Sequence, residues 1–303
     1  MAKSKYDFTD EMVLDGEGRQ AFENGIFYGE REQRFPLLPV EYQKFPGQTA
    51  IITGAAGGQG EMEAKIFAQN GARVIAIDIK EDELKRVVAD IKRDGGEATA
   101  VVFDVRDEEG WKGVAQQAVD TYGSLDLLVN NAGILGPNGT VLSENRESMN
   151  DIMDTDAWGV FYGMHACAPH MIKAGGGAIV NTCSFQGAHF GPAGVFGYSM
   201  AKATVLGMSR AAAADLGKYH IRVNTVNPGH ILTPMTYERS ANRKFLAEAT
   251  MLGRYARAQE VAYPVAFLCS DEAAFITGQE LYIDGGQSRN LSMPSAKGHT
   301  SLD

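Results

Sequence analysis

From residue 48 to residue 283, short apolar runs alternate with helical patterns, and this alternation constrains the fold more than any other feature. Short runs of four to six mainly apolar residues are typical of buried parallel strands. They occur at Gln48–Thr53, Arg73–Ile77, Ala98–Phe103, Leu125–Val129, Ala178–Thr182, Ile221–Val226 and Glu280–Ile283. Helical patterns occupy residues 61–70, 81–94, 107–122, 145–173, 197–217, 239–251 and 259–269. We therefore predict an α/β fold with a doubly wound parallel sheet and helices on both faces.

The alternation also sets the domain boundaries. Nothing in residues 47–287 resembles a linker, so we predict one domain there, followed by a short tail at 288–303. Residues 1–46 form a separate arm that is rich in charge and also in aromatic side chains. Disordered segments are usually poor in aromatics. We therefore expect the arm to pack on the body or on a neighbouring subunit.

Composition excludes several classes of partner. The net charge is −10, which disfavours nucleic acid. No apolar run approaches the ~20 residues of a membrane helix, and no apolar core follows the first lysines as in a signal peptide. The three cysteines are far apart, which argues against a disulfide framework or a zinc site. We expect a cytoplasmic protein without a metal.

The turn after the first predicted strand has the composition of a phosphate-binding loop. Thr53-Gly-Ala-Ala-Gly-Gly-Gln-Gly60 joins that strand to the first helix. Glycines allow the backbone to approach a pyrophosphate, and a helix N-terminus offers free N–H groups. Asp78 ends the second strand, where a carboxylate can accept hydrogen bonds from ribose hydroxyls and repels a 2′-phosphate. These features favour NAD over NADP, although the loop and the acid can also be purely structural.

Tyr198 and Lys202 lie four residues apart, on one face of a predicted helix. A free phenol has a pKa of about 10 and is a poor base at neutral pH. A neighbouring ammonium lowers that pKa, so the pair can exchange a proton with an alcohol or carbonyl oxygen. The same spacing also occurs on ordinary solvated helix faces, so its context decides between the two readings.

Taken together, the motifs strongly resemble those of the short-chain dehydrogenase/reductase family over residues 47–287. They are Thr53-Gly54-x-x-x-Gly58-x-Gly60, Asp104-Val105, Asn130-Asn131-Ala132-Gly133, Ser184 with Tyr198 and Lys202, Pro228-Gly229-x-Ile231-x-Thr233, and Asp284-Gly285-Gly286. The resemblance implies a Rossmann-type fold and an NAD(H)-dependent oxidoreductase. It implies that Ser184 holds the substrate oxygen, Tyr198 exchanges the proton, and Lys202 lowers the pKa of the tyrosine. The cofactor-binding residues that it implies are Thr53, Gly54, Gly58, Gln59, Gly60, Asp78, Ile79, Asp104, Val105, Asn131, Ala132, Gly133, Tyr198, Lys202, Pro228, Gly229, Ile231 and Thr233.

One position departs from the family pattern. In Asp156-Ala-Trp-Gly159-Val-Phe161 an aspartate stands where the family usually has asparagine. In the family this residue anchors a water of the proton relay, at an irregularity of the helix. We expect Asp156 to be a fourth member of the catalytic group and to place negative charge near Lys202, which would shift the pH dependence of the relay.

The loops beyond the strand ends carry an apolar and aromatic set of side chains. In doubly wound folds the ligand binds there. The candidate substrate residues are Phe185, His189, Phe190, Met235 and Tyr237. This lining suits a hydrophobic alcohol or ketone better than a sugar or a charged acid. Each of these side chains can instead serve ordinary loop packing.

Within the family, the run from Gly159 to Asn181 and the aromatic arm are similar to bacterial 20β-hydroxysteroid dehydrogenases. That similarity implies reduction of the C20 ketone of cortisol-like steroids. The alternatives are a dehydrogenase of another cyclic alcohol, such as a bile acid or a terpenoid, and a non-catalytic NAD-binding regulator. Asp78 disfavours an NADPH-dependent ketoacyl reductase. The family resemblance and the small residues on the Tyr198 helix favour a homotetramer.

Overall fold

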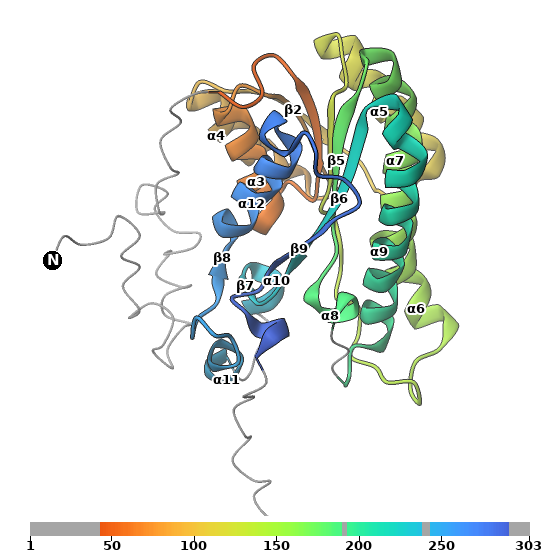
Figure 1. Cartoon of the computed structure of the whole chain (residues 1–303), viewed down its shortest axis with the longest axis vertical. Helices are drawn as coiled ribbons and strands as arrows, with labels where there is room; N and C mark the ends of the chain where they lie inside the picture. The colour runs from red at the N-terminus through yellow and green to blue at the C-terminus, as the bar shows by residue number, and fades with distance from the viewer. Residues whose placement is uncertain (1–42, 190–192, 238–242, 291–303) are drawn as a thin grey trace, which may run out of the picture.

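A seven-stranded parallel sheet forms the centre of the computed structural model, which describes residues 43–189, 193–237 and 243–290 (Figure 1). The strand order is β3-β2-β1-β4-β5-β6-β9, so the chain reverses direction across the sheet between β1 and β4. The strands are β1 Thr49–Thr53, β2 Arg73–Asp78, β3 Glu97–Val102, β4 Leu127–Asn130, β5 Gly177–Thr182, β6 Ile221–Pro228 and β9 Glu280–Ile283. The predicted doubly wound fold is confirmed.

Long helices cover both faces of the sheet (Figure 1). On one face lie α3 Gly58–Gln69, α4 Glu81–Arg93 and α12 Ala258–Cys269. On the other lie α5 Glu108–Tyr122, α7 Gly159–Ala174 and α9 Phe196–Leu216. Shorter helices are α6 Arg146–Met153, α8 Phe185–Ala188, α10 Pro234–Tyr237 and α11 Arg243–Glu248, with 3₁₀ turns at Gly217–Tyr219, Asp271–Ala273 and Gln287–Arg289.

Alternate residues of each strand enter the two cores. In β1, Ala50 and Ile52 join the cluster that contains Phe67 of α3, whereas Ile51 joins the cluster that contains Trp111 of α5. Successive side chains of a strand point to opposite faces, so a strand buried on both sides is apolar throughout. The unbroken apolar runs in the sequence have this cause.

The predicted helix over 145–173 is interrupted. The π-helical turn Asp154–Trp158 separates α6 from α7. Such a turn adds a residue to the helix, which changes the direction of the side chains that follow it, and it is frequent at functional sites. The predicted helix over 239–251 is also shorter, since α11 covers only Arg243–Glu248 among the described residues.

A small second sheet was not predicted. Strands β7 Ile231–Leu232 and β8 Ala256–Arg257 pair in parallel beyond the end of β6. Two-residue strands have no detectable period in a sequence. Their pairing holds the segment after Pro228 against the body of the protein.

Only the last residues of the predicted N-terminal arm are described. Phe45 is fully buried, and its ring stacks on Phe67 with centroids 4.7 Å apart. Lys44 pairs with Glu272 at 2.6 Å. The rest of the arm, residues 1–42, lies outside the described residues, as do residues 291–303 of the predicted tail. Within the described ranges, no helix is long and apolar enough to cross a membrane, and no group of His, Cys, Asp or Glu could hold a metal ion.

Candidate active site

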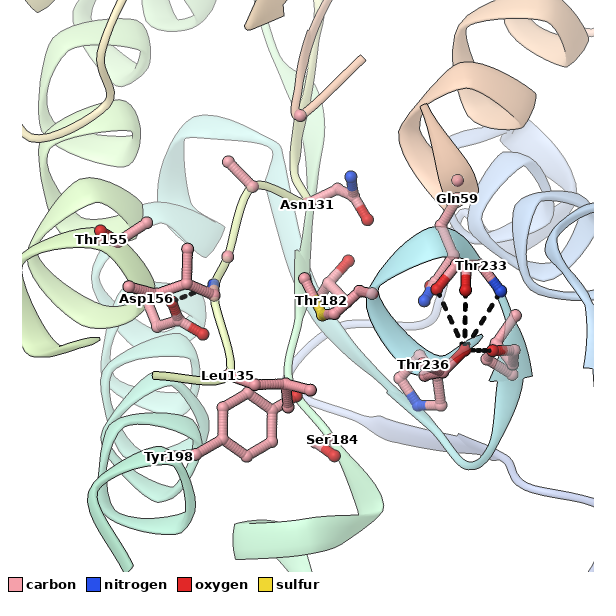
Figure 2. Close-up of a pocket in the computed structure, with 18 of the residues that line it drawn as sticks. Gln59, Asn131, Leu135, Thr155, Asp156, Thr182, Ser184, Tyr198, Thr233 and Thr236 are labelled. Carbon is pink, nitrogen blue, oxygen red and sulfur yellow. Dashed lines mark hydrogen bonds between the residues drawn. The ribbon is translucent and has the colours of Figure 1, made fainter. Parts of the chain in front are cut away.

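A cleft of about 1150 Å³ lies at the carboxyl ends of the parallel strands, where ligands bind in doubly wound folds. Figure 2 shows Asp156 and Gln59 on opposite sides of it, with Tyr198 and Ser184 at one end. Of the predicted cofactor and catalytic residues, all but Thr53 and Gly60 line it. These are Gly54, Gly58, Gln59, Asp78, Ile79, Asp104, Val105, Asn131, Ala132, Gly133, Asp156, Ser184, Tyr198, Lys202, Pro228, Gly229, Ile231 and Thr233.

The glycine-rich turn brings the backbone close to the cleft. Gly54 has φ +69°, which favours glycine, and a Cβ on Gly60 would lie 2.2 Å from the Gly54 carbonyl oxygen. The N-cap of α3 is Gly57, which has no side chain to cap the helix. The first N–H groups of α3 are therefore left to a ligand, as in anion sites at helix N-termini.

Asp78 lies at the end of β2, beside this turn. Its Oδ2 accepts a hydrogen bond from the Ala56 N–H at 3.0 Å, and its Oδ1 accepts one from the Lys80 N–H at 3.0 Å. Two backbone donors fix the orientation of the carboxylate. The ribose role predicted for Asp78 therefore has suitable geometry.

Thr53 has a structural task behind the loop. Its hydroxyl accepts hydrogen bonds from the N–H groups of Asn131 at 2.9 Å and Ala132 at 3.0 Å. The Asn131 side chain donates in turn to the Thr53 carbonyl at 3.0 Å. These bonds join the end of β1 to the end of β4. They set the width of the cleft at the point where the strand order reverses.

Ser184, Tyr198 and Lys202 meet at the other end of the cleft. Ser184 follows β5 and caps α8, with its hydroxyl accepting from the Gln186 N–H at 3.2 Å. Lys202 lies one turn after Tyr198 in α9, with its Nζ 5.7 Å from the centre of the phenol ring. The Lys202 ammonium donates to the Thr182 carbonyl at 3.0 Å. The structure thus brings together the three residues that the sequence predicted.

Asp156 joins this group from the π-helical turn. Its Oδ2 lies 3.2 Å from Lys202 Nζ, and its Oδ1 accepts from the Ile134 N–H at 2.7 Å. The two side chains are 0% and 3% exposed. Gly133 lies against the pair, and a Cβ there would be 2.9 Å from Asp156 Oδ2 and 3.3 Å from Lys202 Nζ. The helix irregularity expected at this position is present.

Burial and charge act in opposition on these groups. Burial raises the pKa of Tyr198, Lys202 lowers it, and Asp156 raises it further, so that the phenol pKa lies above its ordinary value. Burial alone would lower the pKa of Lys202, but Asp156 and Tyr198 outweigh it and raise the value to about 12. Lys202 is therefore charged at neutral pH. Burial also raises the pKa of Asp156, against the charge of Lys202 and the Ile134 N–H.

The predicted substrate residues divide into separate groups. Phe185 and Met235 line the cleft. His189 does not line it; this side chain is exposed and packs edge-on against Tyr282, with ring centroids 6.1 Å apart. Phe190 lies outside the described residues, as does the side chain of Tyr237.

His230 lines the cleft and was not predicted. Its ring meets Phe185 edge-on at 5.4 Å and lies 5.5 Å from the ring of Tyr255. Burial lowers the pKa of His230 to about 4, so it is neutral at physiological pH. Its place inside the Pro228-Gly229-x-Ile231 motif was the only signal available in the sequence.

The donor set fits a dinucleotide. The open N-terminus of α3 suits a pyrophosphate, the oriented carboxylate of Asp78 suits ribose hydroxyls, and the Tyr198 end leaves space for a second ring system. Ile134, Leu135, Val195 and Leu246 add apolar surface around that space. The cleft therefore has the volume and polarity for a dinucleotide together with a small hydrophobic molecule.

Comparison with known proteins agrees with this geometry. The family model described as enoyl-(acyl carrier protein) reductase matches residues 54–288. Cyclohexanol dehydrogenase of Acinetobacter sp. (strain SE19) is 39% identical over 242 residues, which are 80% of this chain and 95% of the relative. The 3-oxoacyl-[acyl-carrier-protein] reductase of Thermotoga maritima is 38% identical over 244 residues, 80% and 98% of the two chains. Carveol dehydrogenase from Mycobacterium avium, crystallised with NAD, superimposes with a TM-score of 0.78 at 30% identity, covering 82% of this chain and all of the other.

Proposed function

Because the chain belongs to the short-chain dehydrogenase/reductase family, we propose that it interconverts a hydrophobic cyclic secondary alcohol and its ketone with NAD(H). The observation that carries this proposal is the convergence of Ser184, Tyr198 and Lys202 on one end of a cleft whose other end suits a nucleotide. All these residue types are retained, so a non-catalytic regulator is disfavoured.

Each residue has a role that its position supports. NAD supplies the chemistry of hydride transfer when it is bound. Ser184 donates a hydrogen bond to the substrate oxygen, and Tyr198 gives a proton to that oxygen during ketone reduction or takes one during alcohol oxidation. Lys202 stabilises the phenolate by its charge. Asp156 and the Thr182 carbonyl hold the ammonium in place.

The cofactor preference follows from Asp78. Its carboxylate is oriented by two backbone N–H groups, at the place where the adenosine ribose of a bound dinucleotide would lie. A 2′-phosphate would meet a fixed negative charge there. This arrangement supports NAD and disfavours NADP, and it also weighs against a ketoacyl reductase that depends on NADPH.

A single-ring cyclic alcohol is the substrate class that we favour. The relatives named for cyclohexanol and carveol act on cyclic alcohols, and the apolar side chains of Ile134, Leu135 and Met235 suit such rings. A steroid with a C20 ketone, the more specific substrate predicted from the sequence, is our second candidate. It depended partly on the N-terminal arm, which lies almost wholly outside the described residues.

A substrate panel tests the proposal. The decrease of NADH absorbance is measured with a cyclohexanone, a monocyclic terpenoid ketone, a C20-keto steroid and an acetoacetyl thioester, each with NADH and with NADPH. We expect turnover of a cyclic ketone with NADH and loss of about a thousandfold in Tyr198→Phe. Turnover of the thioester alone, with NADPH, would contradict the proposal.

We also propose a homo-oligomer, with a tetramer as the form that the family resemblance implies. Large side chains remain exposed at the end of the π-helical turn, where Trp158 lies, and on α7, which carries Phe161 and Ile172. On α9, the neighbouring outer face carries the small exposed residues Ala203 and Gly207. Small residues permit a close approach of helices, and exposed apolar side chains favour contact with another protein surface. Light scattering of wild type and Phe161→Asp tests this, since a tetramer unaffected by the variant would exclude this surface.

A further inference from the structure

The catalytic lysine of this chain has a buried partner of opposite charge. Lys202 Nζ lies 3.2 Å from Asp156 Oδ2, and both side chains are almost completely removed from solvent. The second oxygen of Asp156 is occupied by the Ile134 N–H at 2.7 Å. A carboxylate in this geometry accepts from an amide and faces an ammonium, which is the arrangement of an ionised pair.

The charges at this end of the cleft therefore cancel. Among the described residues, the titratable groups that face Lys202 are Asp156 from the π-helical turn, Tyr198 from its own helix and Cys183 from the end of β5. Burial raises the pKa of Cys183 to about 11, and the phenol pKa also lies above its ordinary value, so both are neutral near pH 7. Burial also raises the pKa of Asp156, but the Lys202 ammonium at 3.2 Å and the Ile134 N–H at 2.7 Å both oppose this and favour the charged carboxylate. One positive and one negative charge therefore remain.

This cancellation matters for the two redox states of the cofactor, and the argument depends on the proposed NAD(H) function. The nicotinamide ring is positively charged when oxidised and neutral when reduced. An uncompensated, buried ammonium at the catalytic end of the cleft repels the oxidised ring and has little effect on the reduced one. A neutral asparagine at position 156 would leave Lys202 uncompensated.

We propose that the Asp156 carboxylate offsets the charge of Lys202 and thereby raises the affinity for NAD⁺ relative to NADH. The same negative charge opposes release of the Tyr198 proton. Asp156 is then a positioning residue that acts through charge. Both consequences have one cause, because a buried negative charge stabilises any positive charge nearby, whether a nicotinamide ring or a proton.

The experiment compares wild type with Asp156→Asn and Asp156→Ser, which remove the charge with side chains of different size. Asp215→Asn, on the exposed part of α9, is the matched control. Dissociation constants for NAD⁺ and NADH are measured by calorimetry on the full chain, and circular dichroism confirms folding. We expect the NAD⁺/NADH ratio of dissociation constants to rise about tenfold in either charge-removing variant, the size of a one-unit pKa effect, and to stay constant in Asp215→Asn.

A second readout separates a charge effect from a packing effect. In Asp156→Asn, the acid limb of the alcohol oxidation profile should move to lower pH by about one unit, because the Tyr198 pKa falls. An unchanged affinity ratio or an unmoved limb, with both cofactors still bound, would overturn the inference and leave the proposed function intact. Absence of NAD⁺ and NADH binding in the wild type would instead refute the proposed function.

Discussion

Glu63 gives the sharpest prediction about stability. It lies in α3 with no exposed surface, and among the described residues neither carboxyl oxygen has a hydrogen-bond partner. Burial raises its pKa from 4.5 to about 8. An acid whose pKa is higher in the folded than in the unfolded state stabilises the fold fully below the unfolded pKa. This contribution is lost as pH rises from about 4.5 to about 8.

The magnitude follows from that window. Deprotonation of Glu63 in the unfolded state lowers the free energy of unfolding by about 1.4 kcal/mol at pH 5.5, about one pH unit above the unfolded pKa. At pH 7.5, nearly three units above it, the loss is about 4 kcal/mol. Wild type should therefore lose about 2 to 3 kcal/mol of stability between these two pH values through this residue. Glutamine has nearly the same shape as glutamate but does not titrate. The Glu63→Gln variant should therefore lack this pH-dependent loss of stability.

The assay is urea unfolding of wild type and Glu63→Gln at both pH values, at one protein concentration and without cofactor. Glu147→Gln, in an exposed position, is the control for removing an acid. The stability gained by Glu63→Gln should be larger at pH 7.5 than at pH 5.5, whereas the control shows no such difference. A gain that is equal at the two pH values would refute the reasoning, because it would mean that the pKa of Glu63 is the same in the folded and unfolded states.

Three substitutions test other parts of the structure. Gly133→Ala should reduce turnover on the order of tenfold or more with little loss of stability, because its Cβ would press on Asp156 and Lys202 at 2.9 and 3.3 Å; steady-state kinetics and thermal unfolding measure the two effects. Asp78→Ser should raise kcat/KM with NADPH relative to NADH by about tenfold or more, since the charge that repels a 2′-phosphate is removed; equal ratios in variant and wild type would exclude this role. Phe45→Ala should cost about 3 to 5 kcal/mol of unfolding free energy, because its buried ring stacks on Phe67; chemical denaturation measures this loss.

The strands and the main catalytic residues could be predicted because they depend on local sequence. A parallel strand buried on both faces is mainly apolar, as Ala50, Ile51 and Ile52 of β1 show. A helix fixes the spacing of Tyr198 and Lys202. The residue order along the chain then places these groups at the same edge of the sheet.

Features that depend on contacts between residues far apart in the sequence could not be predicted from it. The π-helical turn was expected only as an irregularity, since the contacts that Asp156 makes from it, with Lys202 and the Ile134 N–H, are distant in the sequence. His189 was expected at the substrate but packs on Tyr282, a residue of β9 that lies 93 positions later in the sequence. His230 occupies a variable position of its motif, so nothing local distinguished it from a loop residue.

The acids in and beside the cleft differ in the groups that neutralise their negative charge, and this difference affects the choice between NAD and NADP. Glu61 is buried, yet its hydrogen bonds and ion pairs with Arg86 and Lys65 outweigh burial and lower its pKa to about 2. Asp104 is paired with Arg106 at 2.6 Å.

Asp78, in contrast, takes its two hydrogen bonds from backbone N–H groups, which orient a carboxylate without cancelling its full charge. Arg86 lines the same cleft, but its guanidinium is directed to Glu61 at 2.8 Å. The Arg86 guanidinium is therefore already engaged by an acid, whereas the hydrogen bonds of Asp78 come from backbone N–H groups. Removing Asp78 alone should for this reason weaken the discrimination against NADP without creating a strong phosphate site, and high NADP affinity would require that Arg86 also be released from Glu61.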